Sequence, residues 1–279
     1  MDKVIYYFSG TGNSLRAARV IAGEIGGARL CSMRSDPAEA AAPETGIVGF
    51  VCPSYEWDVP EPVRSFIQRL PVSPEAYTFL VVTCVAIHGR CFETVDALLR
   101  QKGSRLHYGR ALHCVASQCV AYEPFPPARL MVPWSEKKAG RIGREVSRRR
   151  ERAYPTMSPL SKWLYPRLMV PLLDLQQEYD KGFYVSSACT GCEICRRVCP
   201  CGNITFSRER PIWNHACTGC NACVVYCPVK AVQFQTPAAY VRLDSFITRR
   251  LGLPEKRTRY HNPYITAADL MKNGEDIQG

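Results

Sequence analysis

The 279-residue sequence contains no apolar run near the roughly 18 to 20 residues that a membrane-spanning helix needs. It also lacks the charged region followed by an apolar stretch that marks a secretory signal. Strand-like sequence begins within a few residues of Met1 instead. We therefore expect a soluble, cytoplasmic protein with no membrane span.

Cysteine, in contrast, is abundant, with 15 residues in the chain. A reducing compartment disfavours disulfides, and eight of these cysteines fall in two tight runs, which favours a metal centre. The scattered remainder is expected to pack as small, buried apolar side chains. So many oxidisable thiols also indicate an anaerobic or oxygen-poor setting.

Both runs, at 189–200 and 217–228, place three cysteines at intervals of three, followed by a fourth cysteine before a proline. Three thiolates at this spacing can surround one iron–sulfur cluster, whereas the fourth lies too far along the chain and reaches the other cluster. Zinc sites usually have paired C-x-x-C units, so zinc is the weaker alternative. We predict two [4Fe–4S] clusters, the first bound by Cys189, Cys192, Cys195 and Cys227 and the second by Cys217, Cys220, Cys223 and Cys199.

Residues 1–130 alternate between strand-like and helix-like patterns. Continuous apolar strands separated by helices are typical of a parallel sheet that is covered on both faces. The predicted fold class is therefore α/β, with a doubly wound parallel sheet in this half of the chain. The expected strands are 4–8, 47–51, 79–84 and 111–116, and the expected helices are 14–25, 62–70 and 92–101.

The first expected strand leads into a loop rich in glycine and hydroxyl groups, and then directly into a helix. Backbone N–H groups at a helix start, with nearby hydroxyl and amide side chains, can hold a phosphate dianion. The loop lacks the Gly-Lys-Ser/Thr of a nucleoside triphosphate site, and Leu15 occupies the third glycine position of a dinucleotide loop. The candidate phosphate-binding residues are Ser9, Gly10, Thr11, Gly12, Asn13 and Ser14.

This phosphate loop (residues 9–14) resembles the hydroxyl-x-Thr-Gly-x-hydroxyl loop that binds the phosphate of FMN in flavodoxins. The order of elements over 1–150 is also similar to that of flavodoxins. With the two cysteine runs, the chain resembles the flavodoxin–ferredoxin fusion proteins of anaerobic bacteria and archaea. The resemblance extends to a tail motif, Arg259-Tyr260-His261-Asn262-Pro263, whose function it does not indicate.

The resemblance implies bound FMN, with its ring at the C-terminal ends of the strands. Loops 53–58 and 86–90 should then meet the ring, and Tyr55 or Trp57 would either stack on it or cover the sheet edge. Loop 86–90 departs from the flavodoxin pattern because it is not rich in glycine. The residues implied for the ring site are Pro53, Ser54, Tyr55, Trp57, His88 and Gly89, with Tyr122 as a further candidate.

These patterns divide the chain into four segments. We expect a flavodoxin-like FMN-binding domain at 1–152, a connector at 153–181, a small α+β two-cluster ferredoxin module at 182–236 and a tail at 237–279.

The formal net charge of +11 would fall to about +5 in the loaded protein, because two oxidised clusters with their thiolates contribute about −4 and an FMN phosphate about −2. We therefore expect no nucleic-acid partner. The basic stretch 135–152 is expected to be a solvated helix face, and a docking face for an acidic electron carrier is the alternative.

The predicted function is an intramolecular electron relay between FMN and two [4Fe–4S] clusters, which exchanges electrons with a soluble electron-transfer protein or reductase. One alternative is a flavin-free carrier of the ferredoxin type, with the N-terminal half as a docking domain. Another is a flavin-dependent reductase of a small molecule, with Trp57, His88 and Tyr122 around its substrate. Whether the chain is an enzyme and how many copies assemble stay open.

Overall fold

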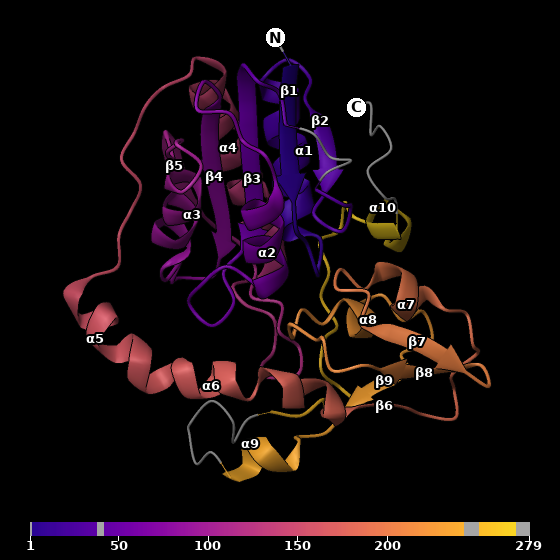
Figure 1. Cartoon of the computed structure of the whole chain (residues 1–279). Helices are drawn as coiled ribbons and strands as arrows, with labels where there is room; N and C mark the ends of the chain where they lie inside the picture. Colours follow the sequence, from indigo (N-terminus) through magenta and orange to yellow (C-terminus); the bar gives the residue numbers. More distant parts are fainter. Residues whose placement is uncertain (1, 38–41, 243–250, 272–279) are drawn as a thin grey trace.

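The computed structural model describes residues 2–37, 42–242 and 251–271, and its N-terminal half is built on a five-stranded sheet. All neighbouring strands are parallel, in the order β2-β1-β3-β4-β5 (Figure 1). This is the strand order of flavodoxin-like doubly wound folds, so the predicted fold class is confirmed. The strands are β1 (Asp2–Tyr7), β2 (Arg29–Ser32), β3 (Gly46–Pro53), β4 (Tyr77–Cys84) and β5 (Tyr108–His113).

Two pairs of helices cover the sheet, α1 (Asn13–Glu24) with α4 (Ala128–Ser147) on one face and α2 (Glu61–Arg69) with α3 (Cys91–Arg100) on the other. Successive residues of β1 enter different cores. Ile5 packs in the core beneath α1 and α4, and Tyr6 packs in the core beneath α2 and α3. Because both faces are buried, the strands read as continuous apolar runs.

Two elements of the N-terminal half, a strand and a helix, differ from the sequence expectation. The pattern missed β2, because its four residues are too few to show a periodicity. The last helix of the domain, α4, begins at Ala128 instead of residue 135. It contains Pro133, and a proline usually marks a helix boundary in a sequence.

The connector runs along the lower edge of the sheet toward the cysteine-rich half (Figure 1). It consists of α5 (Pro159–Leu168), α6 (Val170–Asp174) and a 3-10 helix (Gln176–Gly182). Its buried side chains Tyr165, Met169 and Leu172 belong to the same core as α1 and the cysteine-rich half. The connector is therefore packed structure that joins the two halves.

The cysteine-rich half combines two small antiparallel sheets, β6 (Phe183–Val185) with β9 (Val232–Phe234) and β7 (Ile204–Ser207) with β8 (Arg210–Trp213), and two helices, α7 (Ile194–Val198) and α8 (Ala222–Val225). Each helix begins inside one cysteine run. Gly191 and Gly219, at matched positions, both have left-handed backbone, with φ of 71° and 68°. The two runs therefore have the same local backbone, as an internal duplication requires.

After α9 (Ala238–Arg242), the segment 251–271 returns to the N-terminal half and ends in α10 (Ala267–Met271) (Figure 1). The Asn262 N–H donates to the Thr11 carbonyl over 2.8 Å, and Arg19 pairs with Asp269 at 2.6 Å. The end of the described chain thus contacts its beginning. No helix within the described ranges is long and apolar enough to cross a membrane.

Candidate functional site

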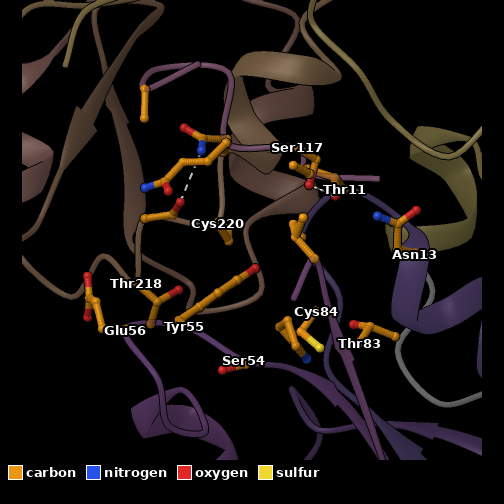
Figure 2. A pocket seen from close by; sticks show the side chains of 18 of the residues that line it. Thr11, Asn13, Ser54, Tyr55, Glu56, Thr83, Cys84, Ser117, Thr218 and Cys220 are labelled. Carbon is orange, nitrogen blue, oxygen red and sulfur yellow. Dashed lines mark hydrogen bonds between the residues drawn. The ribbon is translucent and has the colours of Figure 1, made fainter. Parts of the chain in front are cut away.

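A cavity of about 570 Å³ lies at the carboxyl ends of β1, β3, β4 and β5, where ligands bind in open α/β sheets (Figure 2). Its lining includes the phosphate loop and the loop after β3. The residues of the sequence-predicted site that line it are Ser9, Gly10, Thr11, Asn13, Ser14, Pro53, Ser54, Tyr55 and Trp57, together with Tyr122.

The phosphate loop enters α1 through Gly12, which has a left-handed φ of 93°. No side chain caps the helix start, and the Leu15 N–H donates to the Ser9 hydroxyl over 3.4 Å. The first N–H groups of a helix have no partner within the helix. An anion at this end of α1 would be held mainly by these backbone donors.

The side chains of the phosphate loop bond to the rest of the protein. The hydroxyls of Thr11 and Ser117 lie 2.7 Å apart, those of Ser14 and Thr83 lie 2.8 Å apart, and the Asn13 amide donates to the Val115 carbonyl over 3.1 Å. These side chains are predicted phosphate contacts, and in the structure their bonds fix the shape of the loop.

Three predicted residues, Gly12, His88 and Gly89, do not line the cavity. His88 Nδ1 lies 2.9 Å from the Gly89 carbonyl oxygen, so its ring bonds locally. A Cβ atom on Gly89 would come within 1.8 Å of the Trp57 carbonyl oxygen, and that carbonyl accepts the Arg90 N–H over 2.7 Å. Gly89 therefore serves the close approach of loops 53–58 and 86–90 to each other.

The opposite wall of the cavity comes from the second cysteine run, through Thr218, Gly219, Cys220 and Asn221. A Cβ atom on Gly10 would come within 2.7 Å of Cys220 Cβ and 3.1 Å of the Tyr55 hydroxyl. Tyr55 points toward Cys220 across the cavity (Figure 2). This wall was missed from the sequence, because packing between segments more than 200 residues apart has no local signal.

The cavity wall includes polar atoms that lack a partner within the described part of the chain, among them one atom each of Glu56 and Asn221. Glu56 Oε2 and Asn221 Oδ1 are buried without a hydrogen bond. Burial raises the pKa of the Glu56 carboxyl to about 7. Buried polar atoms are normally satisfied, so these two indicate a polar ligand. The N–H and C=O groups of a flavin ring, together with a phosphate at α1, fit this arrangement.

The cysteines of the predicted first cluster, which we call the first set, surround a small second cavity together with Val185 and Pro228. They come from both runs, because Cys227 joins the three cysteines at 189–195. Burial raises the pKa of the Cys195 thiol to about 12, with further contributions from Cys227, Cys192 and Cys189. Cys192 is exposed.

The cysteines of the predicted second cluster, the second set, lie deeper. Burial raises the pKa of the Cys223 thiol, and Cys217, Cys220 and Cys199 act in the same direction. Backbone N–H groups point at sulfur, since Gly219 donates to Cys217 over 3.3 Å and Asn203 to Cys199 over 3.4 Å. Such donors lower the cost of negative charge on cluster sulfur. In the described ranges, no three His, Cys, Asp or Glu side chains form a group suited to a single metal ion.

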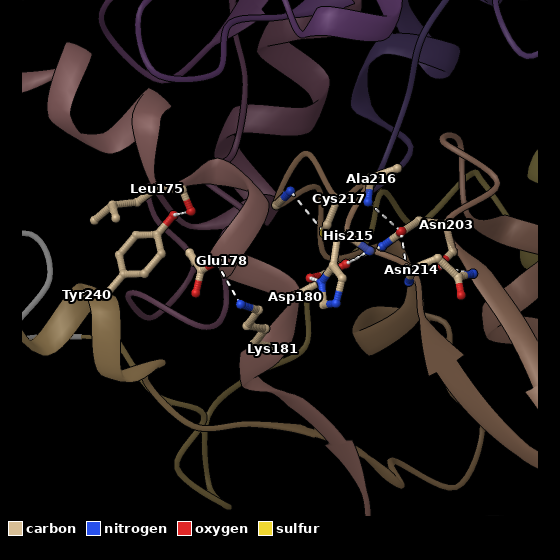
Figure 3. Close-up of polar contacts among 11 residues, drawn as sticks. Leu175, Glu178, Asp180, Lys181, Asn203, Asn214, His215, Ala216, Cys217 and Tyr240 are labelled. Atoms are coloured by element: carbon tan, nitrogen blue, oxygen red, sulfur yellow. Dashed lines mark hydrogen bonds and ion pairs between the residues drawn. The ribbon is translucent and has the colours of Figure 1, made fainter.

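A buried carboxylate anchors the loop before Cys217 (Figure 3). Asp180, at the end of the connector, accepts hydrogen bonds from the Asn203 amide and the His215 N–H, each over 2.8 Å, and lies 2.8 Å from His215 Nδ1. Asn203 Oδ1 in turn accepts the N–H of Ala216 over 2.7 Å. The connector therefore fixes the second set as well as joining the halves.

The family model described as a 4Fe-4S binding domain matches residues 211–233, which include Cys217, Cys220, Cys223 and Cys227. A 4Fe–4S centre transfers single electrons, so the match supports an electron-transfer role. The same chain carries the flavodoxin-like sheet. The chain fits a flavodoxin–ferredoxin fusion.

The N-terminal half of the chain is similar to several solved structures. A two-electron reduced flavodoxin of Megasphaera elsdenii matches 52% of this chain and 98% of its own, with 14% identity and a TM-score of 0.38. A flavodoxin from the domain Archaea matches 53% and 97%, with 15% identity and a TM-score of 0.36. Rubredoxin oxygen:oxidoreductase from the anaerobe Desulfovibrio gigas matches 53% of this chain and 36% of its own, with 15% identity and a TM-score of 0.34. No curated protein matches this chain.

The Asp180 network yields a prediction for the second set. In Asp180→Asn, the carboxylate charge is lost and an amide N–H₂ replaces one of the two oxygens that face Asn203 and His215, which should destabilise the site by about 1–3 kcal/mol. We expect faster loss of iron to a chelator. The control is Glu178→Gln in the exposed pair with Lys181, which should change little. Equal rates in the two variants would contradict this role of Asp180.

Glu56 yields a prediction on pH. Because its folded-state pKa of about 7 lies above the ordinary 4.5, the folded protein keeps a proton that the unfolded chain releases. The stability of the flavin-free protein should therefore fall as pH rises between these two values. Infrared titration should detect one carboxyl group that ionises near pH 7 and is absent in Glu56→Gln. A group that persists in the variant would refute the assignment.

Proposed function

We propose that this chain relays electrons between a bound FMN and two [4Fe–4S] clusters. The observation that carries the proposal is the contact of Cys220, a member of the second set, with Gly10 of the phosphate loop. A cluster at the second set would lie directly beside the flavin cavity. Iron–sulfur clusters exchange one electron at a time, whereas a flavin can take or give one or two. The pairing would connect two-electron chemistry to one-electron carriers.

FMN would be held by two groups of residues in this cavity. The backbone N–H groups at the start of α1 would bind its phosphate, and the loop 53–58 with Tyr55 and Trp57 would meet its ring. When bound, FMN supplies the two-electron redox chemistry. The protein would orient it, and Glu56 and Asn221 belong to the residues that line its cavity. On this proposal the flavin-binding domain spans 1–152 and the ferredoxin module 182–236, with 153–181 as connector and 237–279 as tail.

The order of the relay follows from burial. The second set has two buried and two half-buried cysteines and adjoins the cavity, whereas the first set includes the exposed Cys192. Electrons would pass between FMN, the second cluster, the first cluster and an external partner, in that order or its reverse. The unpaired thiols favour a reducing, oxygen-poor cytoplasm as the setting.

The surface around the first set indicates a negatively charged partner protein. Arg197 donates to the Cys192 carbonyl over 3.5 Å, Arg210 donates to the Ser186 carbonyl over 3.0 Å, and Glu209 lies against Gly191. Among the exposed side chains here, basic ones outnumber acidic ones, since Arg196, Arg197, Arg208, Arg210 and Lys230 accompany Glu193 and Glu209. Opposite charge on a soluble carrier would raise the rate of encounter.

The helix α4 is a poorer docking face for this purpose. It packs on α1 behind the sheet and lies away from α7 and the first set (Figure 1). Its basic side chains are partly engaged within the domain, as Arg144 is with Glu24 at 2.6 Å. The rim of the first set is therefore the better site for electron exchange.

The relay is tested by protein purified without oxygen. We expect about one FMN and about eight iron atoms per chain. Cys223→Ala, which disrupts the second set, should retain FMN but lose fast reduction of the flavin by a one-electron donor. Cys31→Ala, at a buried cysteine of β2, is the control. Absence of FMN even after incubation with excess FMN would refute the relay and favour a ferredoxin-type carrier.

The docking site is tested by charge reversal. Arg208→Glu with Lys230→Glu should slow electron exchange with a small acidic [2Fe–2S] ferredoxin by about tenfold at low salt, and the difference should shrink as salt is added. Arg141→Glu, exposed on α4, should have little effect. A larger effect of Arg141→Glu would assign docking to α4.

A further inference from the structure

The tail motif contacts the phosphate loop directly. The Tyr260 hydroxyl and the Asn262 side-chain amide both donate to Asn13 Oδ1, over 3.2 Å and 3.3 Å. The Asn262 backbone N–H donates to the Thr11 carbonyl over 2.8 Å. Tyr260 and Asn262 are both buried. Residues nearly 250 positions away thus bond to the first residue of α1.

These bonds engage the side-chain oxygen of Asn13, and its amide nitrogen is engaged as well. Its amide nitrogen donates to the Val115 carbonyl, and its oxygen accepts the two tail groups. The side chain of Asn13 is therefore held at both ends. Since Asn13 is the first residue of α1, these bonds hold the start of the helix in place.

The same segment also packs tightly beneath Gly12. A Cβ atom on Gly12 would come within 2.8 Å of Ile265 Cβ and 3.1 Å of Asn262 Cβ. Ile265 is fully buried. The loop therefore has little room to move away from the cavity while the segment is in place.

The segment reaches the ferredoxin module at its other side. The Tyr226 hydroxyl donates to the Ile265 carbonyl over 3.4 Å, and the Tyr226 ring stacks on His261 with 4.8 Å between centroids. Arg259 donates to the Val224 carbonyl over 3.3 Å. Tyr226 directly precedes Cys227, a member of the first set. One short segment thus joins the phosphate loop to the second cysteine run.

We propose that residues 259–265 form a clasp that holds the phosphate loop in the conformation that binds the flavin phosphate and ties that loop to the ferredoxin module. Tyr260 and Asn262 are its positioning residues, and they act through Asn13. The proposal rests on the proposed binding of FMN. A loop that is already ordered before binding loses less conformational freedom on binding, so the clasp raises affinity for the phosphate.

The test compares FMN with riboflavin, which has the same ring and no phosphate. In Tyr260→Phe the dissociation constant for FMN should rise about fivefold, as expected for loss of one hydrogen bond, and the constant for riboflavin should stay within about twofold. Tyr264→Phe removes an exposed hydroxyl from the same segment and serves as the control. Equal weakening of both ligands, or of neither, would overturn the clasp.

A double-mutant cycle separates action through Asn13 from a general loss of structure. In an Asn13→Ala background, Tyr260→Phe should have no further effect on FMN affinity, because its partner is gone. Iron content should stay the same in all variants. Additive effects of the two substitutions would overturn the assignment of Tyr260 to Asn13.

Hydrogen exchange of the flavin-free chain tests the clasp without any flavin. Asn262→Ala should speed amide exchange over residues 10–16, whereas the matched control Tyr264→Phe should not. Unchanged exchange in Asn262→Ala overturns the clasp. If exchange accelerates but the wild-type chain binds no FMN, the clasp holds the loop and the proposed relay is wrong.

Discussion

Close packing between the phosphate loop and the second cysteine run is the constraint on which the rest of this structure depends. Gly10 approaches Cys220 so closely that a side chain at position 10 would force the two loops apart. The connector and the segment 251–271 both run between the two halves of the chain (Figure 1). A cavity between the sheet and the cysteine-rich half is the consequence, and the proposed flavin and second cluster would be neighbours there.

The buried polar groups of the site differ in whether they have hydrogen-bond partners within the protein. Asp180 and Asn203 are buried and fully engaged with the loop before Cys217. Glu56 Oε2 and Asn221 Oδ1 are buried at the cavity and unpaired. The first kind of group fixes the cysteine loops, and the second kind belongs to residues that line the cavity. This contrast makes a polar ligand in the cavity the simplest account of the site.

Local patterns were informative where one segment carries its own signal. The apolar strands predicted the parallel sheet, because strands buried on both faces show no alternation. Spacing within the cysteine runs indicated iron–sulfur clusters, and residues 211–233 match a 4Fe-4S binding domain. The strand β2 has no such signal, because it is only four residues long. The start of α4 was predicted seven residues late, and the helix contains Pro133. His88 and Gly89 fell outside the cavity, since loop 86–90 packs on Trp57.

The sequence alone therefore carries the fold class, the place of the phosphate loop and the chemistry of the cysteine runs, because periodicity, glycine positions and ligand spacing are local properties. Only the tertiary structure decided which surfaces meet. It placed Thr218 and Cys220 in the cavity wall, it engaged Asn13 with Tyr260 and Asn262, and it separated α4 from the first set. Contacts between segments more than 200 residues apart depend on how the whole chain packs, and no short stretch of sequence records that packing.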